Sequence, residues 1–394
     1  MMLSHRWTYL SSITNNQTSL QKNSDFSAAS VHNDLKINHI DIGPEFVAIT
    51  GVFSDNDFVN YLNGQSEIDY IEENHKYSVR TIQSYQEQQK AGTDEIHVPS
   101  NSQDIRKRQL RVESSPNWGL ARISQRQMTN MNEYTYDEMG GSGVTVFVLD
   151  SGVFVDHSDF EGRASHSINT ILYEDENDLG GHGTHVASKI IGKKYGVAKG
   201  AKVRSVKILN RDGDGSTSSL LKGVEHVAQN AIPGKSLINL SLSGKRSKLV
   251  DDALNNLVLR YNIPVFVSAG NDGADACLFS PSSNPNVFSV GAADEHDAVP
   301  KFSNIGACVE MYAPGRNIES AYIGNQYSFR AMDGTSMASP HVAGIAANLM
   351  GRHNFSSAQE VYDTLMSIAT ADILHFDTSR TSSPNYNLLA YSQL

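Results

Sequence analysis

The sequence has little cysteine, no excess of positive charge and no long apolar run, and each absence excludes a class of protein. Its 394 residues include only two cysteines, Cys277 and Cys308, which is too few for a disulfide scaffold but enough for one bridge. The net charge of −11 gives no support to a nucleic-acid-binding role based on phosphate contacts. No apolar run approaches the roughly 18 residues that a membrane span needs.

The N-terminal region also lacks a recognisable export signal. Residues 1–21 contain no apolar core of the kind that a signal peptide has. Residues 1–37 are polar and rich in Ser, Asn and Gln, so we expect a disordered segment or a targeting or pro region. Residues 80–115 are again polar and contain a basic run at 106–108, which predicts an exposed linker with a processing site.

Between these polar stretches and after them, the composition is that of a soluble globular protein, 39% hydrophobic and 19% charged. Residues 38–79 predict a small α+β unit: strand "FVAITGVF", a helix in "SDNDFVNYLNG" with an N-cap at Ser54, and strand "IDYIEEN". From residue 116 onward, unbroken apolar strands alternate with helical patterns. The strands are expected at 144–150, 202–209, 236–244, 263–270 and 286–292, with helices at 218–231 and 248–261. This alternation predicts an α/β domain with a parallel sheet that is buried on both faces.

Four short motifs lie at the ends of these expected elements, where an open α/β sheet binds its ligands. Asp150 ends the strand in "VFVLDSG", and His182 opens a helix in "GHGTHVASKIIG". Asn271 follows the strand in "VFVSAGND", and Ser336 precedes the apolar helix in "DGTSMASPHVAGIAANLM". Each residue alone would be read as a turn former or a helix cap. Their occurrence together in one chain of this architecture favours a shared chemical role.

That role follows from the residue types. A serine hydroxyl is a weak nucleophile, so a neutral imidazole must accept its proton. A carboxylate on the other ring nitrogen holds the imidazole in one tautomer and stabilises the imidazolium that forms. The oxyanion of the tetrahedral intermediate needs fixed donors, which a helix N-terminus and a side-chain amide supply.

The segments "VLDSGV", "GHGTHVAS", "SAGND" and "GTSMASPHVAG" resemble the four signature segments of subtilisin-like serine proteases, in the same order Asp, His, Ser. The resemblance extends from about residue 118 to about residue 389. The stretches "WGLARIS", "YGVAKGAKV" and "DAC…SP" are similar to the proteinase K subfamily, and to its fungal cerevisin-type enzymes in particular. The resemblance implies a three-layer parallel-sheet peptidase domain at 116–394, preceded by an inhibitor-type prodomain at 38–79.

The resemblance also assigns roles to residues. It implies that Asp150 is the orienting acid, His182 the general base, Ser336 the nucleophile and Asn271 the oxyanion-hole donor. It places the substrate between two strand edges and a pocket, formed by Gly213, Asp214, Gly215, Ser241, Leu242, Ser243, Ser268, Ala269, Gly270 and Phe279. Phe279 at the pocket floor implies an apolar residue before the scissile bond, and Thr217 replaces the bulky aromatic that is often found at the S4 subsite.

Further expectations come from the same resemblance. It implies a disulfide between Cys277 and Cys308, and a structural calcium ion held by Pro285, Val287 and Glu310, where Glu310 replaces the shorter acid of the family. No cofactor is expected to be required. The expected protein is a monomeric zymogen that acts on proteins or peptides, is inhibited by its own prodomain, contacts neither nucleic acid nor membrane, and is extracellular or vacuolar.

Two other functions compete with the endopeptidase. A protease-like binding protein would keep its prodomain in the cleft, but it would have no need of all four site residues. A metallohydrolase would use His182 and His185 as ligands, yet helical zinc pairs usually lie four residues apart and no third ligand stands at a recognised spacing. We therefore expect His185 to be a structural histidine.

Overall fold

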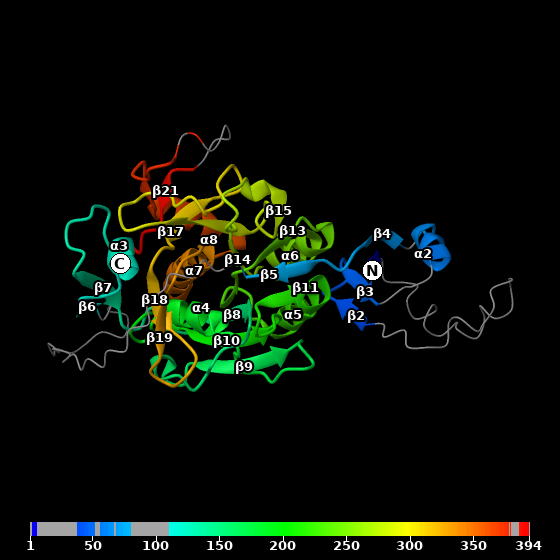
Figure 1. The fold of residues 1–394 in the computed structure, drawn as a ribbon, viewed down its shortest axis with the longest axis horizontal. Helices are drawn as coiled ribbons and strands as arrows, with labels where there is room; N and C mark the ends of the chain where they lie inside the picture. The colour runs from blue at the N-terminus through cyan, green and yellow to red at the C-terminus, as the bar shows by residue number, and fades with distance from the viewer. Residues whose placement is uncertain are drawn as a thin grey trace.

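The structure is a computed structural model that describes residues 2–5, 38–51, 56–66, 68–79, 110–377, 379 and 386–393. The predicted helix cap at Ser54 and the basic run at 106–108 lie outside these residues. Figure 1 shows a large body that holds the central sheet and its helices, with a smaller N-terminal unit beside it.

A nine-stranded sheet forms the centre of the large body. Eight of its strands, from β21 to β9 in spatial order, pair in parallel with their neighbours. The edge strand β20 pairs antiparallel with β21. In spatial order the strands are β20 (Thr370–Ala371), β21 (Leu388–Leu389), β17 (Met311–Pro314), β16 (Phe288–Ala293), β14 (Val265–Ser268), β12 (Ser236–Leu240), β8 (Thr145–Asp150), β10 (Lys202–Lys207) and β9 (Ala164–Asn169).

Strands of this kind need cover on both faces because their side chains alternate between the two. Every residue of β12, β14 and β16 is buried, which explains their unbroken apolar sequences. Helices α4 (His182–Ile191) and α7 (Thr335–Arg352) pack together on one side of the sheet, and α5 (Thr217–Asn230) and α6 (Lys248–Tyr261) pack together on the other (Figure 1). The predicted three-layer α/β architecture is therefore confirmed.

Smaller elements complete the large body. They are α3 (Trp118–Ile123), α8 (Ala358–Ile368), the short turns η3 (Ser158–Phe160) and η4 (Ala276–Leu278), the hairpin of β6 (Leu110–Ser114) with β7 (Glu133–Asp137), and the hairpin of β18 (Ile318–Ala321) with β19 (Phe329–Met332). In the part of the chain that the structure describes, no helix has the length and apolar character that crossing a membrane requires.

The N-terminal unit is a four-stranded antiparallel sheet with one helix. The strand order is β2 (Asn38–Asp41), β3 (Val47–Thr50), β1 (Met2–His5) and β4 (Ile68–Glu72), and the helix is α2 (Asn56–Asn63). After β4 the chain continues into β5 (Lys76–Ser78), which leaves this unit and joins a second four-stranded sheet on the large body, in the order β11 (Asp214–Ser216), β5, β13 (Ser243–Lys245) and β15 (Phe279–Ser280).

The structure moves two of the predicted boundaries. Residues 1–37 were expected to lack regular structure, but Met2–His5 pairs with both β3 and β4 as strand β1. The predicted linker 80–115 extends too far, because Leu110–Ser114 is strand β6 of the large body. The side chains of β6 alternate between exposed and half-buried, so its sequence is polar enough to resemble a linker.

Candidate active site

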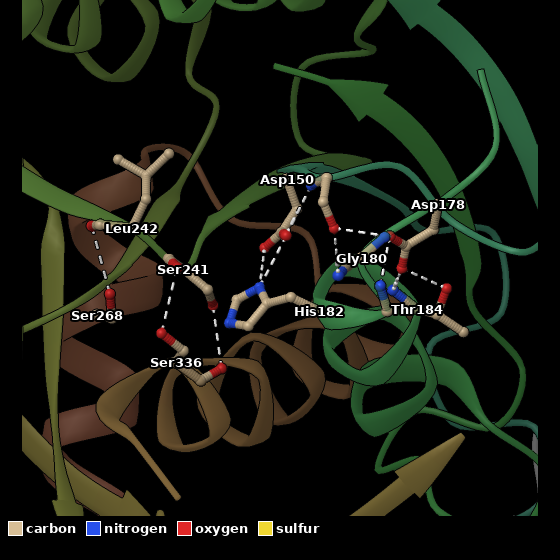
Figure 2. Close-up of polar contacts among 12 residues, drawn as sticks. Asp150, Asp178, Gly180, His182, Thr184, Ser241, Leu242, Ser268 and Ser336 are labelled. Carbon is tan, nitrogen blue, oxygen red and sulfur yellow. Dashed lines mark hydrogen bonds and ion pairs between the residues drawn. The ribbon is translucent and has the colours of Figure 1, made fainter. Parts of the chain in front are cut away.

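Asp150 and His182 meet at the carboxyl end of the central strand β8. Asp150 is the last residue of β8, and His182 is the first residue of helix α4. The Nδ1 atom of His182 lies 2.8 Å from Oδ1 and 3.0 Å from Oδ2 of Asp150 (Figure 2). Both side chains are buried, and the backbone N–H of Ser151 also donates to Asp150 Oδ1, at 2.7 Å. The carboxylate therefore faces the imidazole and fixes the tautomer with the proton on Nδ1.

Ser336 lies in the first turn of α7, beside this pair. Its hydroxyl donates to the carbonyl oxygen of Ser241 at 3.2 Å, and the hydroxyl of Ser241 donates back to the carbonyl of Ser336 at 3.1 Å (Figure 2). His182 Nε2, on the side of the ring away from Asp150, is buried and has no hydrogen-bond partner among the described residues. Catalytic hydrogen bonds of this kind are often long or absent before substrate binds.

Asn271 is held against the same end of α7. Its Oδ1 accepts hydrogen bonds from the backbone N–H and the hydroxyl of Thr335, both at 2.9 Å. This leaves the Nδ2 end directed at Gly334, where an added Cβ would lie 3.2 Å from Asn271 Nδ2 and 3.6 Å from the backbone nitrogen of Ser336. Gly334 has a φ of 152° and no side chain, so the backbone at the helix start can lie close to the Asn271 amide and the Ser336 nitrogen.

His185 lies one turn further along α4 and points away from the site. Its Nε2 lies 2.9 Å from the carbonyl of Ile318 and 3.1 Å from that of Arg330, so it must donate to them. Burial, with the charges of Lys189 and His182, lowers the pKa of His185 to about 3. A neutral histidine whose Nε2 donates to two carbonyls ties α4 to the β18–β19 hairpin and cannot offer that nitrogen to a metal.

Strand β5 occupies the two edges that were predicted to bind substrate. It pairs antiparallel with β11 on one side, with Gly215 opposite Tyr77, and with β13 on the other, with Gly244 opposite Tyr77. The ring of Tyr77 is buried, and its hydroxyl donates to the carbonyl of Lys245 at 3.3 Å. A Cβ on Gly244 would lie 2.5 Å from this ring, so the glycine creates the space that the ring fills.

Val79, the residue directly after β5, lies near His182. The backbone N–H of Val79 donates to the carbonyl of Gly213 at 3.0 Å. Val79 and Gly213 line the same hollow as His182 and Tyr322. Val79, which follows the strand between β11 and β13, therefore lies in the hollow that the imidazole of His182 also lines.

The remaining predicted cleft residues lie around β13 and the strand ends beside it. Ser241 and Leu242 are buried and lead directly into β13, and the carbonyl of Leu242 accepts a hydrogen bond from the Ser268 hydroxyl at 3.4 Å (Figure 2). Ala269 and Gly270 follow β14, and Gly270 needs its φ of 100° to turn toward Asn271. Phe279 is half-buried on β15, opposite Lys245, on the side of β13 away from β5.

The disulfide prediction is confirmed, because Cys277 and Cys308 form a bridge with a Cα–Cα distance of 5.3 Å. For the predicted calcium ligands, Val287 is buried, Pro285 is exposed, and one Glu310 carboxylate oxygen accepts the backbone N–H of Ser289 at 2.7 Å. Burial raises the pKa of Glu310 to about 8. The described residues contain no group of three or more His, Cys, Asp or Glu side chains suited to a metal.

Sequence reasoning missed one buried acid beside the site. Asp178 lies four residues before His182 and accepts hydrogen bonds from the loop and helix around it (Figure 2). The available signal was an acid just before "GGHGT", because two glycines leave a helix start without a side-chain cap.

Comparisons with known proteins identify the family of this chain. The model of the subtilase family, designated Peptidase_S8, matches residues 141–387. The chain belongs to the subtilase family. Subtilisin-like protease 2 of Pseudogymnoascus destructans is 37% identical to this subtilase over 363 residues, which cover 90% of this chain and 86% of the relative. Subtilisin-like serine protease Cla h 9.0101 of Davidiella tassiana is 40% identical over 323 residues, covering 76% and 60% of the two chains.

A solved structure, that of a cold adapted subtilisin-like serine proteinase, matches this subtilase with a TM-score of 0.66 and 37% identity. The match covers 71% of this chain and all of the other. The predicted family, the fold of the peptidase domain and the assignment as a subtilisin-type serine endopeptidase are confirmed by these matches.

Proposed function

We propose that this subtilase hydrolyses peptide bonds through a triad of Asp150, His182 and Ser336. The observation that carries the proposal is the buried contact of 2.8 Å between Asp150 and His182, with Ser336 at the start of α7 beside it. In the reaction, His182 Nε2 accepts the proton of the Ser336 hydroxyl as Oγ attacks the scissile carbonyl. Asp150 keeps Nδ1 protonated and stabilises the imidazolium.

The tetrahedral intermediate would be stabilised by the two donors near Gly334, Asn271 Nδ2 and the Ser336 N–H. Its collapse transfers the proton from His182 to the leaving amine and leaves an acyl-enzyme on Ser336. Water, deprotonated by His182, then releases the acid. Leu242, Ala269 and Phe279 support an apolar preference for the residue before the scissile bond.

We also propose that the N-terminal unit and β5 form an inhibitory prodomain. The Glu72 carboxylate accepts hydrogen bonds from the Ser247 hydroxyl and, at 3.2 Å, from the Leu249 N–H, so it caps the start of α6. Asp41 donates its N–H to Glu225 of α5 at 2.7 Å. Since β5 lies between the two cleft edges as an added strand, a substrate could enter only after it leaves. Cleavage is expected between His75 and Val112.

A structural calcium ion at Glu310 is part of the proposal. The half-buried carboxylate of Glu310 has its pKa raised to about 8 by desolvation, so a cation would stabilise its charged form. The carbonyls of Pro285 and Val287 would complete the ligand set. We further propose that the enzyme needs no other cofactor, acts as a monomer, and works outside the cell or in a vacuole, where the Cys277–Cys308 bridge persists.

A fluorophosphonate probe tests the central proposal. The processed protein should be labelled on Ser336 and lose peptidase activity, and strong chelators should leave the rate of labelling unchanged at low temperature. Absence of labelling after the N-terminal unit is removed would mean a binding protein that only resembles a protease. Loss of activity with a chelator, together with indifference to the probe, would mean a metallohydrolase.

A further inference from the structure

The carboxylate of Asp178 is the most heavily hydrogen-bonded polar side chain beside the catalytic pair. Its Oδ1 accepts the N–H groups of Gly180 at 3.0 Å and Gly181 at 2.7 Å and the hydroxyl of Ser151 at 2.9 Å. Its Oδ2 accepts the N–H of Thr184 at 2.8 Å and the hydroxyl of Thr184 at 2.6 Å. Asp178 is only 4% exposed, so five donors converge on one carboxylate that the proposed mechanism does not use.

These hydrogen bonds replace the side-chain N-cap that the start of α4 lacks. The N-cap residue of α4 is Gly181, which has no side chain to bond the unpaired N–H groups of the first turn. Asp178 takes over that role for Thr184 directly. For Gly183 it acts through Ser151, whose hydroxyl donates to Asp178 and accepts the Gly183 N–H at 3.0 Å. His182 is therefore flanked on both sides by residues held by one carboxylate.

The same carboxylate is linked to the partner of His182. Ser151 follows Asp150 in the chain, and its N–H donates to Asp150 Oδ1 at 2.7 Å while its hydroxyl donates to Asp178 at 2.9 Å. One side chain thus fixes the backbone beside the acid and the backbone beside the imidazole. A change in the hydrogen bonds of Asp178 would alter the position of His182 relative to Asp150.

We propose that Asp178 is a positioning residue that sets the orientation of His182 relative to Asp150 and Ser336, an inference that rests on the roles proposed above for these three residues. Asn at this position keeps the shape of the side chain. Its NH₂ group, however, replaces one carboxylate oxygen and must then face N–H or O–H donors. Either the Thr184 pair or the group from Ser151, Gly180 and Gly181 then loses its acceptor.

The chain offers a matched control at the other end of α4. Asp159 is 6% exposed and accepts hydrogen bonds from the Ser188 hydroxyl at 2.6 Å and the Lys194 N–H at 2.7 Å. It holds the same helix at its C-terminal end, away from the catalytic pair. Asp159→Asn should therefore cost stability without moving His182.

The test compares the wild type with Asp178→Asn, Asp159→Asn and Ser336→Ala. Each protein is expressed as the full chain. A variant that does not process itself is processed by a trace of wild-type enzyme. Active sites are counted with a fluorophosphonate, and kcat and KM are measured per active site. We expect Asp178→Asn to lose about 10²-fold in kcat with KM within about threefold, because a misplaced base acts on the transition state and not on binding. Asp159→Asn should lower Tm comparably and keep kcat within about threefold of wild type.

Equal kcat per active site in the two Asn variants would overturn the positioning role. Inactive wild type would instead overturn the proposed function, so the two failures are distinguishable. If Asp178→Asn does not fold, Thr184→Ser and Thr184→Val decide the matter. The Ser variant keeps the hydroxyl that bonds Asp178 and should retain kcat, while the Val variant should lose about tenfold at unchanged KM. Equal kcat in these two variants also overturns the proposal.

Discussion

The peptidase domain and the N-terminal unit bury their apolar side chains in different ways. The strands of the central sheet are covered by helices of the same domain, and Val146, Leu237 and Val290 are fully buried there. Among the described residues, the N-terminal unit has a small separate core of Val47, Ile49 and Leu62, against which Ile68 and Ile71 pack. Four of its other buried apolar side chains, Ile40, Ile42, Phe46 and Ala48, belong to the core of the large body.

This difference in burial indicates that the N-terminal unit depends on the peptidase domain for its fold. A unit of about 40 residues buries too little surface to be stable alone. The N-terminal unit therefore needs the helices α5 and α6 as its second layer, and in return it caps α6 and fills the cleft. The peptidase domain holds the whole proposed site on its own strand ends and helix starts. Catalysis should thus depend on that domain alone, and its assembly and inhibition on the N-terminal unit.

The largest expected effect is a loss of activity without a loss of stability in the peptidase domain. Ser336→Ala should lower kcat by about 10⁶-fold, the loss that removal of the nucleophile causes in subtilisin. Among the described residues, the Ser336 hydroxyl donates one hydrogen bond, to the carbonyl of Ser241, so Tm should change little. Peptidase assays with differential scanning calorimetry check both expectations. Activity at the wild-type level in the purified variant would refute the serine mechanism.

Removing the N-terminal unit should have the next largest effect, on the yield of active enzyme. Residues 110–394 refolded alone should give little activity, because parallel sheets with many non-local contacts fold slowly. Residues 1–79 added in trans should raise the yield of folded protein and then inhibit it. The same fragment with Tyr77→Ala should still assist folding but inhibit more weakly, because Tyr77 is the buried residue of β5.

The comparison between the two parts fails if the shortened chain refolds to full activity and the fragment changes neither yield nor rate. A fragment that inhibits without assisting folding would leave only the cleft contacts of β5 as its function.

Most of the peptidase fold could be predicted because its elements are encoded locally. The predicted helix 248–261 coincides with α6, where Ser247 caps the start and apolar residues recur on one face. The predicted strand 236–244 is split in the structure into β12 and β13, because the chain turns at Ser241 and Leu242 toward the cleft. Nothing in their residue types marks that turn.

The site could be predicted in part for the same reason. Asp150, His182, Asn271 and Ser336 stand in short motifs that are visible in the sequence. Most donors to Asp178 come from residues 180–184, but its link to Ser151, 27 residues away, appears only after folding. The strand pairing of Met2–His5 is equally non-local, because its partners begin at residue 47.

Asn271→Ala should show that an interaction within the peptidase domain acts on the transition state alone. We expect kcat to fall by about 10²–10³-fold with little change in KM, since the amide donates to the developing oxyanion. Steady-state kinetics on a peptide substrate, with active-site titration, measures both values. A raised KM with unchanged kcat would assign Asn271 to substrate binding instead. Asn271 also accepts from Thr335, so Tm must be recorded alongside.

Removing the disulfide should weaken the peptidase domain without altering the N-terminal unit. The Cys277–Cys308 bridge closes a loop of 31 residues, which in the chain-entropy model contributes about 3–4 kcal/mol to the free energy of unfolding. Cys277→Ser with Cys308→Ser should lower the denaturant midpoint by a corresponding amount, measured in a Ser336→Ala background to prevent self-digestion. Two free thiols in the native protein by intact mass would contradict the bridge.

The smallest expected effect concerns two buried lysines of the peptidase core. Lys207 is fully buried, with Nζ 3.0 Å from Glu174 and 2.5 Å from the carbonyl of Ser151. Lys189 is equally buried, but its Nζ has no hydrogen-bond partner among the described residues. Lys207→Met should therefore destabilise the protein, by about 3 kcal/mol, because the buried Glu174 keeps only the more exposed Arg211, at 3.6 Å, as an ion-pair partner among the described residues. Lys189→Met should instead stabilise it by about 1–4 kcal/mol.

The gain from Lys189→Met should depend on pH in a defined direction. Burial lowers the pKa of Lys189 from 10.5 to about 7, so between these values the unfolded chain binds one more proton than the folded chain. The free energy of unfolding of the wild type consequently rises with pH between these two values. Below pH 7 Lys189 is protonated in both states, and its buried charge destabilises the folded protein to the full extent. Thermal unfolding at pH 6 and pH 9, in the Ser336→Ala background, should show a larger gain in Tm at pH 6. An equal gain at both values would mean that Lys189 keeps its proton in the folded core, and a loss at both would mean that its ammonium group has a partner there.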